Sequence, residues 1–437
     1  MSLTTVLLSS LAALGSAGDD WPTWRGPDGQ GVSSGKPPAQ WSEKKNVRYK
    51  VLLPGKGSGT PIVIGDRIYL TTAVATGTAP PAAEEEQGDR GRRSRRGFGR
   101  SRRPLVDHQY VMMALDRADG SVVWKKVGRE SKPHEGTHSD GTFASASVVS
   151  DGEILLAQFG SNGLFAYDFE GKELWKTDLG DMQVRGTFGE GASPAIHGDT
   201  VVVNWDHEGE SFIVALDKKT GEEIWLQERD ERSSWSTPLI VERDGLAQVI
   251  VNATGACAYD LESGDVLWTA GGNTSNVIPM PIHHDGMVFL ASGFRGAHLQ
   301  AIELDAADGD VTGTSAVAWT FEEDMPYVPS MVLHDGILYA VKGNSGMLSA
   351  FDAESGERLW GPERLGDVSN VYASPVVAGG HLYVVGRDGS TTVLKPGRKF
   401  EILHTNHLDE GCDASPAIAG DQLFLRGKKH LYCIEGK

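Results

Sequence analysis

AYDFEGKELW, residues 166–175, is the stretch that decides the fold. It combines a small residue, Asp168, a turn at Gly171, and Trp175 four residues after that glycine. The aspartate accepts hydrogen bonds from backbone N–H groups of the turn, and the glycine adopts the positive φ angle that the turn needs. Apolar residues flank the turn on both sides. The stretch therefore predicts two neighbouring antiparallel strands joined by a tight turn.

The same pattern recurs along the chain. Copies with the same spacing between glycine and tryptophan begin at Ala114, Ala215, Ala258 and Ala350, and a looser copy begins at Ala301. One tryptophan in each unit is best explained as a wedge between adjacent sheets, and a ligand cage is the alternative interpretation. The residues expected to dock the units in this way are Trp124, Trp175, Trp225, Trp268, Trp319, Trp360 and, as shown below, Tyr49.

A second element precedes each tryptophan motif. It is a Ser-Pro or Thr-Pro dipeptide, followed by two short apolar strands around a glycine turn; proline is tolerated as the first residue of a strand. It occurs at Thr60, Ser193, Thr237, Ser374 and Ser415, and Ser147, Met280 and Ser330 occupy the same slot. Four strands in each unit of this length match one blade of a propeller. The sequence therefore predicts an all-β fold, an eight-bladed β-propeller over residues 46–437 with four antiparallel strands per blade.

The ends of the chain predict how the ring closes. The last unit, from Ala414 onward, supplies three strands and lacks the fourth. Residues 46–55 have the pattern of that missing strand, with Tyr49 in the position of the tryptophan. An N-terminal strand that completes the last blade leaves no exposed sheet edge at the junction.

Three other segments precede or interrupt the repeats. An apolar run ending in small residues predicts a signal peptide over residues 1–17, and hence export to a periplasmic or extracellular compartment. Residues 18–45 form an N-terminal arm, whose tryptophans and prolines suggest a segment laid across the propeller surface. Residues 75–108 interrupt the first blade with an Arg-rich insertion that is expected to be disordered. This insertion is either a tolerated loop or a binding segment for a polyanion.

Composition restricts the function classes. A net charge of −18 argues against nucleic acid as the main partner of the folded part. No apolar run is long enough for a membrane span, and a monomer is expected. The three cysteines are too few for a disulfide framework, although Cys412 and Cys433 belong to the same unit and a bond between them is one alternative.

Candidate site residues come from the loops that lead into the innermost strands, because these loops meet at one mouth of the channel. They mix charged, amide and aromatic side chains, which suits a polar ligand or a peptide, while the alternative for each is a solvated loop residue. The candidates are His138, Asp140, Arg185, Glu190, Trp235, Asn276, Tyr327, Asn370, Tyr372 and Asp413. No zinc-hydrolase or serine-hydrolase motif is present in the sequence, so neither catalytic residues nor a metal site is predicted.

The repeat resembles that of the pyrroloquinoline-quinone (PQQ) dependent dehydrogenases, and at this length the chain is more similar to BamB-like exported propellers. Complete blades without a recognisable catalytic cluster favour a non-enzymatic binding or scaffolding propeller without a cofactor. The repeat type and the charged loops on one face give the alternative, an oxidoreductase that uses PQQ with calcium, or another metal. Two features depart from these families. The three cysteines are far apart in sequence, unlike the adjacent pair of the dehydrogenases, and no cysteine follows the predicted signal peptide to carry a lipid.

Overall fold

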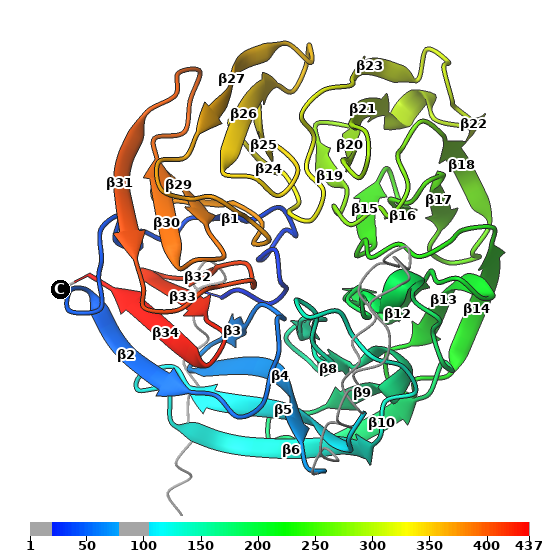
Figure 1. The fold of residues 1–437 in the computed structure, drawn as a ribbon. Helices are drawn as coiled ribbons and strands as arrows, with labels where there is room; N and C mark the ends of the chain where they lie inside the picture. Colours follow the sequence, from blue (N-terminus) through cyan, green and yellow to red (C-terminus); the bar gives the residue numbers. More distant parts are fainter. Residues whose placement is uncertain (1–19, 78–104, 437) are drawn as a thin grey trace, which may run out of the picture.

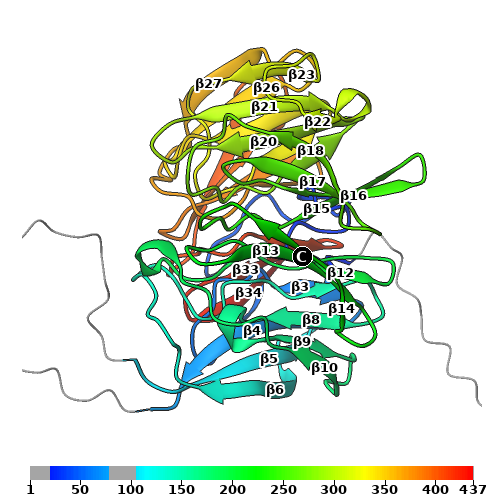
Figure 2. The same cartoon turned by 90° about the vertical axis from the view of Figure 1, so that its right-hand side faces the viewer.

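The ring of eight sheets is the main feature of the structure, a computed structural model that describes residues 20–77 and 105–436 (Figure 1). The prediction of an all-β, eight-bladed propeller with four antiparallel strands per blade is confirmed. Figure 2 shows neighbouring blades stacked face to face when the ring is seen from the side. The predicted signal peptide, and the part of the Arg-rich insertion between residues 78 and 104, lie outside the described residues.

Each blade is a meander whose first strand lies next to the channel and whose last strand lies at the rim. Blades 1 to 4 consist of β3 Ile62–Ile64, β4 Arg67–Ala75, β5 His108–Asp116 and β6 Val122–Ser131; β7 Val149–Ser150, β8 Leu155–Gln158, β9 Leu164–Tyr167 and β10 Glu173–Thr177; β11 Ala195–His197, β12 Thr200–Trp205, β13 Ser211–Asp217 and β14 Glu223–Arg229; and β15 Leu239–Arg243, β16 Leu246–Val251, β17 Ala256–Asp260 and β18 Val266–Ala270, with β22 Gly309–Asp310 added at the rim.

Blades 5 to 8 consist of β19 Ile282–His284, β20 Met287–Ser292, β21 His298–Glu303 and β23 Val317–Phe321; β24 Val332–His334, β25 Ile337–Val341, β26 Met347–Asp352 and β27 Arg358–Arg364; β28 Val376–Ala378, β29 His381–Val385, β30 Ser390–Leu394 and β31 Ile402–His407, with β1 Val32–Ser33 added at the channel; and β32 Ala417–Ala419, β33 Gln422–Arg426, β34 His430–Glu435 and β2 Val47–Leu52. Three 3-10 turns, η1 Gly160–Asn162, η2 Arg185–Thr187 and η3 Leu304–Ala306, are the helical segments of the described residues. Within residues 20–77 and 105–436, no helix has the length and apolar content of a membrane span.

The N-terminal strand closes the ring as predicted. β2 pairs antiparallel with β34, and Tyr49 stands opposite Cys433. The Tyr49 hydroxyl donates a hydrogen bond to the carbonyl oxygen of Arg117 in blade 1 (3.1 Å), so the closing strand also links blade 8 to blade 1. All three cysteines are free thiols, which decides against the alternative of a bond between Cys412 and Cys433.

The motif tryptophans join neighbouring blades by hydrogen bonds as well as by packing. In five blades the indole N–H donates to a carbonyl oxygen in the turn of the next blade, at 2.7–3.1 Å. The motif glycine of that turn packs against the indole ring of the tryptophan. At Gly221 a Cβ would lie 2.4 Å from an atom of Trp175, so a larger residue does not fit there. Trp268 is the exception and donates to Gln248 of its own blade (3.0 Å), because the next blade has the longer turn.

The Ser-Pro element contributes a second link, which we call the hydroxyl ring. A backbone N–H of one blade donates to the hydroxyl of the equivalent Ser or Thr in the next blade, at 2.9–3.2 Å. The pairs are Thr60 to Ser147, Ser147 to Ser193, Ser193 to Thr237, Met280 to Ser330, Ser330 to Ser374, and Ser374 to Ser415. Met280 has no hydroxyl, so no such bond joins blades 4 and 5, and among the described residues none joins blades 8 and 1. The recurrent hydroxyl in the sequence is thus explained by contacts between blades.

Replacing one hydroxyl of this ring is expected to destabilise the fold measurably. In Ser374→Ala the N–H of Ser330 loses its acceptor, and both residues are buried. A buried donor without a partner costs about 1–3 kcal/mol of unfolding free energy. Urea denaturation of Ser374→Ala measures the loss. The matched control is Ser139→Ala, an exposed serine whose removal is expected to change stability by less than about 0.5 kcal/mol; equal effects would contradict the account.

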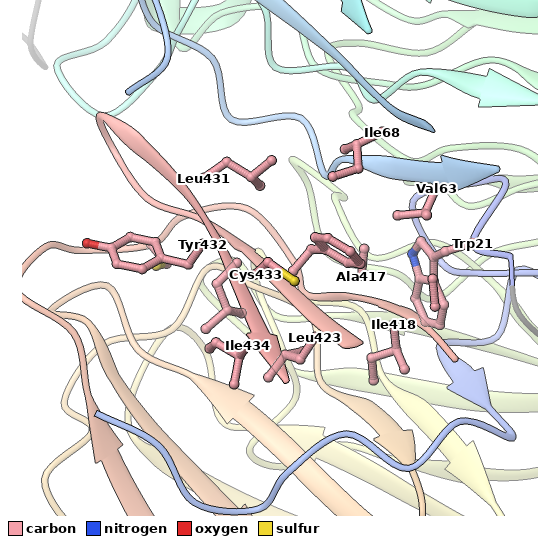
Figure 3. Packing of buried hydrophobic residues seen from close by; sticks show 14 of the residues in the cluster. Trp21, Val63, Ile68, Ala417, Ile418, Leu423, Leu431, Tyr432, Cys433 and Ile434 are labelled. Atoms are coloured by element: carbon pink, nitrogen blue, oxygen red, sulfur yellow. The ribbon is translucent and has the colours of Figure 1, made fainter. Parts of the chain in front are cut away.

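Residues 20–33 of the N-terminal arm lie in the channel, and the rest of the arm runs from the axis along blades 7 and 8 to the rim, so the predicted surface segment is only its second half (Figure 1). Trp21 forms a bridge with Val63 of the innermost strand β3, and β1 pairs parallel with the innermost strand β28. Trp21 is fully buried, and Figure 3 shows it between Val63 of blade 1 and Ile418 of blade 8. The reason is that an eight-bladed ring leaves an axial space lined by apolar residues, which the tryptophan fills.

Arg25 holds the arm in place inside the channel. Its guanidinium is buried and donates to the carbonyl oxygens of Pro375 (2.8 Å), Met331 (2.6 Å) and Gln30 (3.1 Å), so it bonds blades 6 and 7 to the arm itself. Burial lowers the pKa of Arg25 to about 9, which still leaves the side chain protonated at neutral pH. A buried cation that bonds three carbonyl groups fixes the turn of the arm at the axis.

Candidate functional site

A cavity of about 280 Å³ lies on the axis of the ring, at the mouth where loops converge; we call it the axial cavity. Two kinds of loop reach this mouth, the loops leading into innermost strands and the loops joining the second and third strands of each blade. On the channel side the arm forms its floor, where Trp24 lines it. The hydroxyl ring encircles it, since Thr60, Ser147, Ser193, Thr237, Ser374 and Ser415 all line it. The arm thus closes the channel beneath the axial cavity, so that the cavity opens only toward the mouth.

Seven of the ten candidate residues line the axial cavity. They are His138, Asp140, Glu190, Trp235, Tyr327, Tyr372 and Asp413. The other three do not line it. Arg185 and Asn276 meet each other nearby, with the guanidinium donating to the amide oxygen of Asn276 at 3.3 Å. Asn370 is exposed, and its backbone carbonyl accepts a hydrogen bond from the N–H of Arg387.

Arg387 joins three loops of the mouth and was missed by the sequence analysis. It lies between β29 and β30, in a loop that joins the second and third strands and that no repeat motif marks. Its guanidinium bonds the carboxylate of Asp413 (2.6 Å) and that of Asp140 (3.3 Å), and it stacks on the ring of Tyr372 at 3.7 Å. Asp140 belongs to the loop between blades 1 and 2, while Arg387 belongs to blade 7, so this cluster joins loops that are not neighbours in the ring.

Aromatic side chains form the opposite wall of the cavity. Phe188 packs edge-on against Trp235 with ring centroids 6.4 Å apart, and against His138 at 5.4 Å. The indole of Trp235 donates to the carbonyl oxygen of Gly189 (2.6 Å), which fixes its orientation. Tyr327, on the far side, packs against another ring outside the cavity. The wall therefore offers flat apolar surface next to acidic groups.

Acidic side chains outnumber basic ones around the cavity. Hydrogen bonds from Arg387 hold the pKa of Asp140 below its usual value, so this carboxylate stays ionised at neutral pH. Burial raises the pKa of the Tyr372 hydroxyl, so that group stays neutral. Asp413 and Glu190 add two further acidic side chains to the lining. Five hydroxyls of the lining also accept backbone N–H groups of neighbouring blades, so they are held in place.

Comparison with known proteins assigns the fold to a family. The family model for outer membrane protein assembly factor BamB matches residues 39–203, 107–268 and 209–437, which together cover the propeller. The chain belongs to the BamB family. Of two curated BamB relatives, that of Burkholderia pseudomallei is 24% identical over 325 residues, 71% of this chain and 75% of the relative. That of Alkalilimnicola ehrlichii is 27% identical over 172 residues, 38% of this chain and only 42% of the relative's own length.

This BamB-family propeller also has the fold of quinone-dependent enzymes. The quinohemoprotein alcohol dehydrogenase of Comamonas testosteroni superposes with a TM-score of 0.63 at 11% identity, over 97% of this chain and 82% of that chain. At that identity the likeness shows the fold alone. The same architecture is therefore compatible with scaffolding and with catalysis, and the residues of the site must decide between them.

The residues of the axial cavity do not fit PQQ. This cofactor is a planar tricarboxylate, so a site for it needs cationic side chains that neutralise its carboxylates. The lining instead presents Asp140, Glu190 and Asp413. Arg387, the guanidinium that bonds this lining, is already shared by the two aspartates. The axial cavity therefore offers the carboxylates of PQQ no free cationic partner among the described residues.

Proposed function

We propose that this BamB-family propeller is a non-enzymatic scaffold of the exported compartment, and that its axial cavity binds a polypeptide segment. The observation that carries the proposal is the blind, acidic, aromatic-walled cavity at the mouth of a plugged channel. Such a pocket accepts one side chain of a segment laid across the mouth. The matched family model and the relatives are named outer membrane protein assembly factors. This supports the proposal that the bound segment is an unfolded strand of a β-barrel protein.

The chemistry of the wall indicates which side chain enters. The carboxylates of Asp140 and Asp413, beside flat aromatic rings, favour a positively charged Arg or Lys side chain of the segment. The carbonyl and N–H groups of an extended segment would stay outside, over the loops of the mouth. One anchoring side chain in a pocket is the usual way in which a small site dominates the affinity for a peptide.

The test is peptide binding by fluorescence anisotropy. The probe is a short labelled peptide with the alternating pattern of an outer-membrane β-strand and one central Arg. We expect Tyr372→Ala, which removes part of the wall, to weaken binding about tenfold, equivalent to about 1.4 kcal/mol. Asp413→Asn, which removes a charge from the lining, is expected to have a similar effect at low salt and less effect at high salt.

The matched control is Asp66→Asn, an acidic residue at the turn between β3 and β4, on the face opposite the mouth. It is expected to leave the affinity unchanged. Equal losses in Asp66→Asn and Asp413→Asn would show general charge attraction instead of a site. Dye reduction with an alcohol, after incubation with PQQ and calcium, would replace the scaffold proposal with the oxidoreductase.

A further inference from the structure

A second, smaller cavity of about 30 Å³ lies between blades 2 and 3, behind the wall of the axial cavity. We call it the inter-blade cavity. His134, Glu135 and Glu190 meet there, and one ligand atom from each lies within 4.8 Å of the others. His134 and Glu135 follow β6, and Glu190 precedes β11. Within the described residues this is the one group of three such side chains close enough to hold a metal ion.

Two buried amide groups complete the lining. Gln158, at the end of β8, and Asn204, in β12, line the inter-blade cavity and are 4% and 1% exposed. Neither side-chain oxygen has a hydrogen-bond partner. The amide nitrogen of Asn204 donates to Ser234 Oγ and to the carbonyl oxygen of Ser236. These two bonds determine the orientation of the amide, with its oxygen toward the cavity. An unpaired buried acceptor is costly, so these oxygens indicate a missing positive or hydrogen-bonding ligand.

The three candidate ligands are already oriented by neighbouring groups. His134 Nε2 lies 2.6 Å from the carbonyl oxygen of Met182, which leaves Nδ1 as the candidate ligand atom, with the carboxylate of Asp181 at 3.7 Å from it. The two oxygens of Glu190 accept bonds from the Ser161 N–H (2.7 Å) and hydroxyl (2.6 Å). Glu135 accepts the N–H of Val184 at 3.0 Å. Outer partners of this kind are typical of the ligands of a metal site.

Space and charge agree with this assignment. Gly160 makes room for Glu190, because a Cβ at that position would lie 1.7 Å from the carboxylate oxygen. Among the described residues neither Glu190 nor Glu135 forms an ion pair with a lysine or arginine, so the negative charge of the cavity lacks a cationic partner.

We propose that the inter-blade cavity binds one divalent cation through His134, Glu135 and Glu190, with the amide oxygens of Gln158 and Asn204 available as further ligands. The donor set is rich in oxygen and contains one imidazole, which suits Mn²⁺, and Ca²⁺ if the imidazole stays outside. Because Glu190 also lines the axial cavity, the cation would stiffen the wall that the two cavities share.

The test measures metal uptake by the full chain and needs no peptide, so its failure is separable from failure of the proposed function. Protein stripped with EDTA is titrated with Mn²⁺, and free Mn²⁺ is followed by electron paramagnetic resonance. We expect one bound ion per chain and a rise in the melting temperature. Ca²⁺ and Zn²⁺ are titrated in parallel to rank the three ions.

Variants locate the ion. Glu135→Gln and Glu190→Gln are each expected to weaken Mn²⁺ at least tenfold, and His134→Asn, at a partly exposed side chain, keeps the test possible if Glu190→Gln fails to fold. The matched control is Glu410→Gln, from a His–Glu pair with His430 (3.0 Å) that has no third ligand, and it is expected to bind normally. No uptake, or uptake that the three variants leave unchanged, would show that the cavity holds water only.

Discussion

Asp206→Ala is expected to lower the free energy of unfolding by about 3–5 kcal/mol. Asp206 and Arg229 form an ion pair whose side chains are 0% and 2% exposed, with Nε and the carboxylate oxygen 2.7 Å apart. Although burial alone lowers the pKa of Arg229, the charge of Asp206 raises it overall, so the guanidinium stays charged. Removing the carboxylate leaves that charge buried without its counterion, and the Ser234 hydroxyl also loses its acceptor.

Urea denaturation measures this effect, and a double variant is its control. Asp206→Ala combined with Arg229→Met removes both charges, so it is expected to be more stable than Asp206→Ala alone. The Tyr259 hydroxyl, which also contacts Arg229, loses a partner in the double variant, so full recovery is not expected. A double variant as unstable as the sum of its two single changes would show that the pair is not coupled.

Trp21→Ala is expected to cost about 3–5 kcal/mol, the range for truncating a buried tryptophan. Trp21 is fully buried in the cluster that joins the arm to blades 1 and 8. Its ring also supports the turn of the arm, because Gly26 lies flat on it at a φ of 81°, where a Cβ would lie 2.7 Å from the ring. Truncation leaves a hole at the seam where the closing strand completes the ring.

Two measurements follow the Trp21→Ala variant. Urea denaturation reports the loss of stability, and limited proteolysis reports release of residues 20–33 from the channel. Leu52→Ala is the control, since this side chain is 71% exposed on the closing strand and its loss is expected to change stability by less than about 0.5 kcal/mol. If both variants behave alike, the arm contributes little to the ring.

The repeats made the fold predictable from sequence, whereas the inside of the channel was not. Tryptophan and hydroxyl positions recur once per blade, so one unit explains all of them. The arm occurs once, and its place depends on the axial space that only the closed ring creates. Its tryptophans and prolines therefore suggested a surface segment, while the structure buries Trp21 and Arg25 at the axis.

The candidate site was predicted in part for a related reason. Loops leading into the innermost strands follow a recognisable motif, so residues such as Asp140 and Tyr372 were found. Arg387 was missed because its loop joins the second and third strands, which carry no marker in the sequence. His134 and Glu135 are recognisable as possible metal ligands only together with Glu190. That contact joins loops of different blades, so no local spacing in the sequence predicts it.

Site-specific photo-cross-linking tests most directly whether the axial cavity is the binding site. A photoreactive phenylalanine analogue replaces Phe188 at the mouth in one variant and Val266, 55% exposed on a rim strand, in another. The account predicts that the labelled peptide cross-links from position 188 and not from position 266, and that unlabelled peptide competes. Cross-linking from position 266 while position 188 stays unlabelled would contradict it.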